Sequence, residues 1–158
     1  MGDTLLVGAG PGRIHAYQHT GARIPSKDLR IRTGDRATGI EYANDRIYIG
    51  DARLRRLAAY TADGERAARY DVRLLANPQG PRGIAYGHGR FYTGDWTLEP
   101  LVFAYDEFGR HLPGHDFDLG GPFRGREGAH GPAGLVFADG ALYVLDWRGD
   151  QILPYAID

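Results

Sequence analysis

The chain has 158 residues, of which 42% are hydrophobic and 25% charged, a length and composition typical of one folded domain. Its formal net charge of −1 gives no electrostatic reason to expect nucleic acid or an anionic membrane as a partner, and the lack of cysteine excludes disulfides and thiolate metal sites. We predict no signal peptide at the N-terminus and no membrane-spanning segment.

Glycine is unusually frequent, at 24 residues, as expected for many short strands joined by tight turns. The first predicted strand is the apolar stretch 5–8, and the second, 14–17, ends on Tyr17. A glycine turn at 19–21 leads to a short third strand at 27–31. The same succession then returns along the chain, and no segment shows helical periodicity.

A longer unit begins at Gly39. Residues 39–51 form an apolar run, a turn pair and a second apolar run, which is the pattern of a β-hairpin. Copies lie at 83–95 and 134–146, and all three turn pairs tolerate the positive φ that two-residue hairpin turns need. We name the two hairpin strands A and B.

Two further predicted strands follow each hairpin, except that the last copy stops after the first of them. Strand C carries a tyrosine in every copy, and strand D is the short stretch that follows the next turn. We interpret the tyrosines as packing residues between repeats rather than as an aromatic ring around a ligand. They are Tyr17, Tyr60, Tyr105 and Tyr155.

Four antiparallel strands in about 45 residues form the unit of a β-propeller, in which each repeat is one blade. We therefore predict an all-β fold, with about 3.5 blade repeats in a single domain, 1–158. The approximate repeat bounds are 4–33, 34–77, 78–121 and 130–158. Their strand order is BCD, ABCD, ABCD and ABC.

The incomplete end repeats raise a question of assembly. Blades bury their apolar faces by stacking, so open ends leave faces uncovered. A second copy could complete a ring of about eight blades, and we favour this homodimer because two-fold closure is common. The chain could instead be a fragment of a longer propeller, or a small irregular four-bladed ring.

Residues 83–95, 102–110 and 116–119 resemble the NHL-like and SMP-30/gluconolactonase-like β-propellers, and in particular repeats of bacterial surface proteins. The resemblance implies an exported or surface location in bacteria. SMP-30-like enzymes would imply lactone hydrolysis at a calcium ion held near strand A. At the ligand position the repeats have Thr38, Arg82 and Ala133, none a hard oxygen ligand of the right charge, so we predict no cofactor and no catalytic residues.

Candidate binding residues gather where strand B ends. Asp51, Asp95 and Asp146 end strand B, either as a cation-binding ring or, as we favour, as caps for turn N–H groups. Trp96 and Trp147 follow two of them, and they either stack on carbohydrate or peptide or cap the blade edge as packing residues.

Two further residues complete the predicted set. Arg148 begins an Arg-Gly-Asp tripeptide, the sequence used by integrin ligands, but we favour a tight hairpin turn here because Gly-Asp suits one. His130 lies in an inserted stretch, 120–132, which is the kind of loop that can carry a function. We expect a ligand, if there is one, on the face formed by the B–C and D–A loops.

The sequence therefore favours a non-catalytic binding or assembly module that self-associates. The alternatives are a metal-dependent hydrolase of SMP-30 type and a structural segment of a larger surface protein. Fold alone cannot separate them, because propellers carry many functions.

Overall fold

A computed structural model describes residues 4–10, 12–31, 37–95, 101–120, 132–146 and 149–157. These residues contain fourteen strands in four antiparallel sheets. Their helical segments are three single 3-10 turns, η1 (Pro25–Lys27), η2 (Ala68–Tyr70) and η3 (Pro113–His115). No helix in the described part of the chain is long and apolar enough to cross a membrane.

The four sheets are blades 1 to 4 in chain order. Blade 1 contains β1 (Thr4–Gly8), β2 (Arg13–Gln18) and β3 (Leu29–Arg30), and blade 2 contains β4 (Ala37–Ala43), β5 (Arg46–Asp51), β6 (Arg56–Thr61) and β7 (Val72–Arg73). Blade 3 contains β8 (Ile84–Gly87), β9 (Arg90–Gly94), β10 (Leu101–Asp106) and β11 (Phe117–Asp118). Blade 4 contains β12 (Gly134–Ala138), β13 (Ala141–Asp146) and β14 (Gln151–Ala156). The predicted order BCD, ABCD, ABCD, ABC is confirmed.

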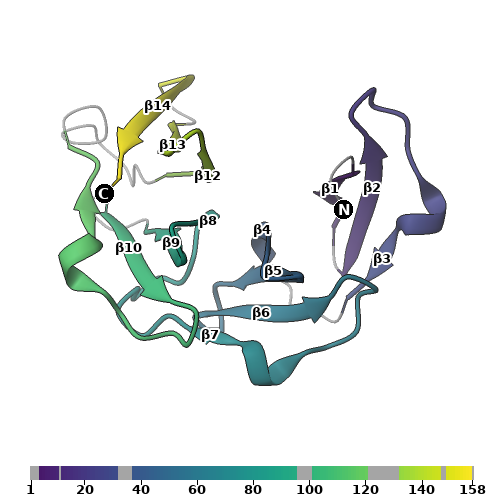
Figure 1. Ribbon diagram of the computed structural model, residues 1–158, viewed down its shortest axis with the longest axis horizontal. Coiled ribbons are helices and arrows are strands. Elements are labelled where there is room, and N and C mark those ends of the chain that lie inside the picture. Colours follow the sequence, from purple (N-terminus) through teal and green to yellow (C-terminus); the bar gives the residue numbers. More distant parts are fainter. Residues whose placement is uncertain are drawn as a thin grey trace.

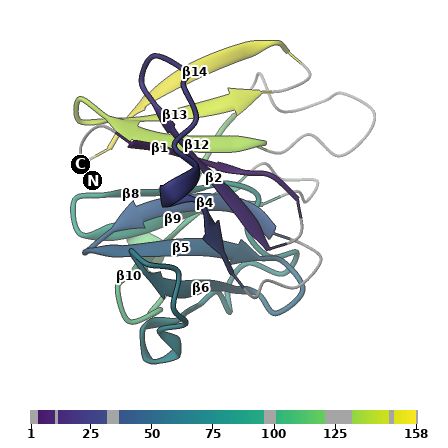
Figure 2. The same cartoon turned by 90° about the vertical axis from the view of Figure 1, so that its right-hand side faces the viewer.

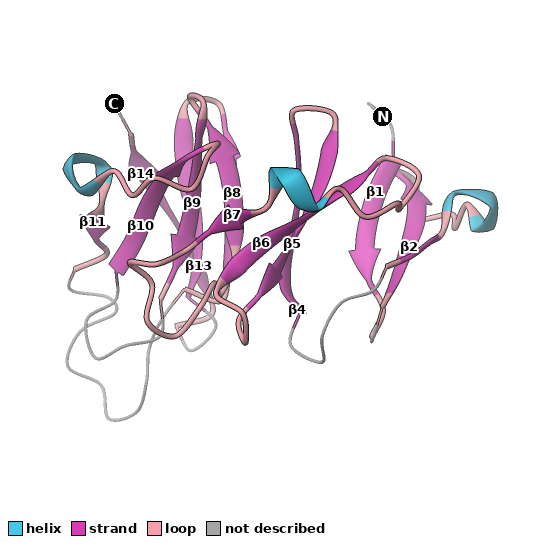
Figure 3. Cartoon of the chain, turned by 90° about the horizontal axis from the view of Figure 1, so that it is seen from below, coloured by secondary structure: helices cyan, strands magenta, loops and turns pink. Residues whose placement is uncertain are grey.

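The blades follow one another around an open arc, with blade 1 and blade 4 at its two ends (Figure 1). Strands β4, β8 and β12 lie toward the inside of the arc, while β7 and β11 lie outside (Figure 1). Strands such as β5, β8 and β12 are seen lengthwise from the side (Figure 2). The 3-10 turns lie on the outer rim, between strands C and D (Figure 3).

The A–B turns have the geometry that their residues predict. Both central residues of each turn have positive φ, for example 50° at Asn44 and 57° at Asp45. The equivalent pairs, which contain His88 and Asp139, have the same property. Such turns match the right-handed twist of the flanking strands, so each fixes the register of its hairpin.

Three apolar clusters, one at each joint between neighbouring blades, form the core. Tyr60 and Tyr105 are almost fully buried in two of them. Tyr155 packs at the third joint, where its hydroxyl donates to the carbonyl oxygen of Leu119 at 2.9 Å. The packing role predicted for the strand C tyrosines is confirmed for these three, whereas Tyr17 of blade 1 is partly exposed at the end of the arc, where no blade precedes it in the described structure. At each joint a blade covers the face of the one before it.

Candidate functional site

The aspartates at the ends of strand B are buried. Asp51 is 6% exposed, Asp95 1% and Asp146 3%. Asp51 Oδ1 accepts the N–H of Leu54 at 3.0 Å, and Asp146 Oδ1 accepts the N–H of Gly149 at 3.0 Å. Two of the three carboxylates thus close the turn that leads into strand C, as in the capping interpretation.

The other predicted binding residues fall elsewhere. Trp96, Trp147, Arg148 and His130 lie outside the described residues. On the B–C and D–A face the β5–β6 loop contacts the chain that follows β7, where the N–H of Leu74 donates to the carbonyl oxygen of Arg55 at 2.9 Å. In the part of the chain that the structure describes, no three His, Asp or Glu side chains gather where they could hold a metal ion.

A second set of aspartates, which the sequence reasoning missed, recurs in blades 1 to 3. Asp28, Asp71 and Asp116 each lie just before strand D. Their Oδ1 atoms accept the N–H of Ala16, Ala59 and Ala104 in strand C, at 3.1, 3.0 and 2.8 Å. We call this arrangement the aspartate latch. It satisfies a strand C amide that the two-residue strand D does not reach.

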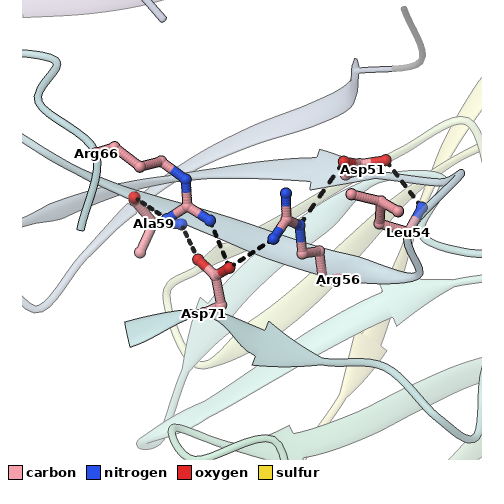
Figure 4. A network of polar contacts seen from close by, with 6 residues as sticks. All are labelled: Asp51, Leu54, Arg56, Ala59, Arg66 and Asp71. Carbon is pink, nitrogen blue, oxygen red and sulfur yellow. Dashed lines mark hydrogen bonds and ion pairs between the residues drawn. The ribbon is translucent and has the colours of Figure 1, made fainter. Parts of the chain in front are cut away.

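The other oxygen of each latch binds a basic side chain. Asp71 Oδ2 accepts from Arg56 at 2.9 Å and from Arg66 at 2.5 Å (Figure 4). Asp116 Oδ2 contacts His111 Nε2 at 2.6 Å. In blade 1 the hydrogen bond from Arg23, together with smaller contributions, lowers the pKa of Asp28 to about 2. The latch is structural, since it joins strand C to strand D within one blade.

A hollow of about 470 Å³ lies at the inner side of the arc. Its lining is mostly apolar and comes from β1, β4 and β12, with the side chains Thr4, Leu5, Leu6, Ile40, Glu41, Tyr42, Leu135 and Val136. Glu41 is the one ionisable carboxyl group among these residues. Burial, partly offset by the N–H groups of Tyr42 and Tyr86, raises its pKa to about 7.

The two blade faces at the ends of the arc have no neighbouring blade in the described structure (Figure 1). Strand pairing brings alternate residues of β12, β13 and β14 onto one side of blade 4, and none of them is charged. This C-terminal face consists of Gly134, Val136, Ala138, Ala141, Tyr143, Leu145, Ile152, Pro154 and Ala156. Val136 is 53% exposed and Ile152 64%.

The other end of the arc exposes the opposite side of blade 1. The register pairs Leu5 with Tyr17 and Val7 with His15. We call these four residues, with Arg13 and Arg30 at their edge, the N-terminal face. Leu5 is 59% exposed and Val7 40%. The opposite side of the same strands, which includes Ile14, packs against blade 2.

Comparison with known proteins identifies the fold. No family model matches the chain, and no curated protein matches its sequence. Among solved structures, glutaminyl cyclase from Myxococcus xanthus superposes with a TM-score of 0.67 at 16% identity, over 99% of this chain and 69% of that one. The WD40 domain of Neurospora crassa Pan2 superposes at 0.54 and 12%, over 98% of this chain and 47% of that one.

The chain is an arc of β-propeller blades. A Bacteroides thetaiotaomicron protein of unknown function also matches, with a TM-score of 0.65 at 16% identity, and this chain covers 45% of it. The computationally designed Ika4 protein matches at 0.54 and 13%, over 99% of this chain and 86% of that protein. Identities this low establish the fold and leave the activity open.

Proposed function

We propose that this chain is a non-catalytic assembly module of NHL-like type, in which two copies join through their end faces to complete a ring of blades. One observation carries the proposal. The residues exposed at the two ends of the arc occupy the same repeat positions as residues that are buried at the internal joints.

The C-terminal face shows the equivalence clearly. Tyr143 and Ile152 stand at the positions of Tyr48 and Leu57 in blade 2, which are 3% and 0% exposed beneath blade 3. In blade 3 the same positions are held by buried side chains that blade 4 covers. The C-terminal face therefore has the composition of a face that another blade covers.

The N-terminal face shows the same relation. Leu5, Val7 and Tyr17 stand at the positions of Ile47, Ile49 and Tyr60 in blade 2. Those three are 0%, 3% and 1% exposed beneath blade 1. Because burial of apolar area contributes about 25 cal/mol per Å², two such faces favour association. Self-association supplies both faces at once and closes a ring by two-fold symmetry.

The molar mass in solution tests this proposal. We expect light scattering to give about 35 kDa, twice the 17.4 kDa of one chain, at micromolar concentration. Ile152→Glu, which puts a charge on the C-terminal face, should lower the mass to that of one chain. The matched control is Leu54→Glu, because Leu54 is 55% exposed in the β5–β6 loop, away from both end faces. A wild-type mass of 17.4 kDa over the whole concentration range would refute the proposal.

A further inference from the structure

Two of the internal joints depend on a glycine in strand B that meets a proline of the next blade. A Cβ atom placed on Gly50 would lie 3.2 Å from Pro81 Cγ and 2.7 Å from Thr38 Oγ1. A Cβ on Gly94 would overlap Pro132. Pro81 stands three residues before strand A of the following blade, and Pro132 two residues before it. The missing side chain thus makes room for the strand A of a complete neighbour.

The strand B glycine of the first joint has no such close contact. There the following blade has Ala37 at the proline position, and a Cβ on Gly8 of blade 1 would have no atom within 4 Å. Beside Gly8 the described structure thus has neither a proline of the next blade nor a strand A of its own blade, the two groups that approach the Cβ position of Gly50.

Blade 4 departs from the pattern. Its strand B has Leu145 where blades 1 to 3 have Gly8, Gly50 and Gly94. Leu145 is 38% exposed and lies beside Ile152 on the C-terminal face. A blade that brought a proline and a strand A to this face, as blades 3 and 4 do at their joints, would collide with the leucine. The face instead fits a blade whose inner region is empty.

Blade 1 is such a blade. Its sheet has the order β1-β2-β3, and β1 corresponds to strand B, so no strand A lies inside it in the described structure. Beside Leu5, at the free edge of β1, the described structure has the hollow of about 470 Å³ that Ile40 and Tyr42 also line, and in the other blades this edge of strand B is where strand A lies. Because Leu5 and Ile40 make this space apolar, the side chain of Leu145 is suited to fill part of it.

The outer edge of blade 4 points to contact through faces rather than through a shared sheet. In blades 1 to 3 a strand C alanine donates its N–H to the aspartate latch. In β14 this position is Pro154, which has no N–H to donate. Proline on an edge strand also opposes pairing with an incoming strand.

We propose that the two copies associate head to tail, with Leu145 of one copy seated in the strand A space of blade 1 of the other. This inference rests on the proposed self-association. It adds which face of one copy meets which face of the other, and which side chain fills the space between them. Each dimer then contains two identical joints, in each of which a C-terminal face meets an N-terminal face. The competing arrangement pairs like faces, C-terminal with C-terminal and N-terminal with N-terminal.

A mixing experiment separates the two arrangements. Ile152→Glu disables the C-terminal face, and Leu5→Glu disables the N-terminal face. Head-to-tail association predicts that each variant alone is a monomer, because every joint needs both faces. An equimolar mixture should regain a species of about 35 kDa, because one joint can form between the two intact faces.

The outcomes distinguish the two proposals. If the wild type dimerises while either single variant still dimerises through its unaltered face, like faces pair and the head-to-tail inference is wrong. If both variants are monomers and the mixture stays monomeric up to high concentration, it is also wrong. If the wild type itself is a monomer, the proposed function fails as well. Circular dichroism of each variant, compared with Leu54→Glu, checks that it is folded.

Leu145→Gly tests the fit without adding a charge. This change restores the glycine of the internal joints, and it should raise the dissociation constant about a hundredfold or more by leaving a cavity in the joint. Unchanged or tighter association would show that the face receives a blade with its own strand A and proline, and would overturn the inference. Leu75→Gly is the matched control, because Leu75 is 71% exposed in the connection between β7 and β8.

Discussion

Replacing Glu41 by glutamine should remove a pH dependence of stability that the wild-type protein shows between about pH 4.5 and pH 7. Glu41 pairs with Tyr48 in the β4–β5 register, on the side of blade 2 that faces blade 3. Its carboxyl accepts the N–H of Tyr42 at 3.0 Å. Blade 3 has the fully buried Ala85 at this position. A carboxyl group thus lies where the repeat otherwise places an apolar side chain.

The direction in which stability changes with pH follows from the raised pKa of Glu41. Burial raises the pKa of Glu41 from 4.5 to about 7 in the folded protein, so the protonated form favours folding. Its stabilising contribution is complete below about pH 4.5 and is lost as the pH rises through 7. The pKa difference sets a ceiling of about 3 kcal/mol on the free energy of unfolding. Because water reaches part of the side chain, we expect about 1–2 kcal/mol.

Urea unfolding at several pH values from 4.5 to 8.5, followed by circular dichroism, measures this effect. Glu41→Gln should be more stable than the wild type by about 1–2 kcal/mol at pH 8 and close to it at pH 5. Glu65→Gln is the matched control, because Glu65 is an exposed glutamate on the outer rim. Parallel pH profiles for the wild type and Glu41→Gln would refute the assigned cause.

Three further changes test the joints and the latches. Gly94→Ala should lower the free energy of unfolding, measured with urea, by about 1–3 kcal/mol because the added Cβ overlaps Pro132. Gly8→Ala is the control: its Cβ has no atom within 4 Å, so it should change the free energy of unfolding by less than about 0.5 kcal/mol. Equal effects of the two changes would contradict the joint geometry. Asp71→Ala should cost about 2–4 kcal/mol in the same assay, since it leaves a strand C amide without its acceptor and removes one carboxylate partner from Arg56 and Arg66, which keep Asp51 and the carbonyl oxygen of Ala59. A neutral result would show that the latch is dispensable. Because the pKa of Asp28 is lowered to about 2, the stability it contributes should be present above about pH 4 and lost as the pH falls from 4 to 2, and acid titration of Asp28→Asn should lack that part of the wild-type loss.

Most of the fold could be predicted from the sequence because each repeat contains strong local signals. The turn pairs, such as Asn44-Asp45, favour one hairpin geometry, and the alternation in strands such as 46–51 specifies which side faces a neighbouring blade. These signals act over a few residues, so the strand order at both ends could be predicted correctly. The family resemblance predicted the same fold, and the structural comparisons confirm the propeller while leaving the finer family a proposal.

The candidate site was harder to predict. The aspartates at the end of strand B are conspicuous because they follow apolar runs, yet Asp51 and Asp146 bind their own turns. The latch aspartates do have a sequence signal, because Asp28 and Asp71 each stand eleven positions after the strand C tyrosine of their repeat, Tyr17 and Tyr60. Sequence alone does not reveal their acceptor role, because the bond to strand C depends on how the outer turn folds back.

The role of Leu145 could not be predicted from sequence either. An apolar residue in strand B is unremarkable until the neighbouring proline shows that the position needs to be empty. Close packing between blades is a three-dimensional property, and its requirements become visible only when the joints are compared with one another.

The aspartate latches also bear on the order in which the chain folds. Each latch bond joins residues 12 positions apart in the sequence, for example Ala16 and Asp28 or Ala59 and Asp71. The A–B hairpins join residues that are even closer in the sequence. Short loops cost little entropy to close, so chains rich in such contacts fold quickly. A blade can therefore assemble from its own residues as soon as it leaves the ribosome and then serve as the template on which the next blade condenses. Folding would then proceed along the arc from one end, and in the proposed dimer association of two chains would be the step whose rate depends on protein concentration.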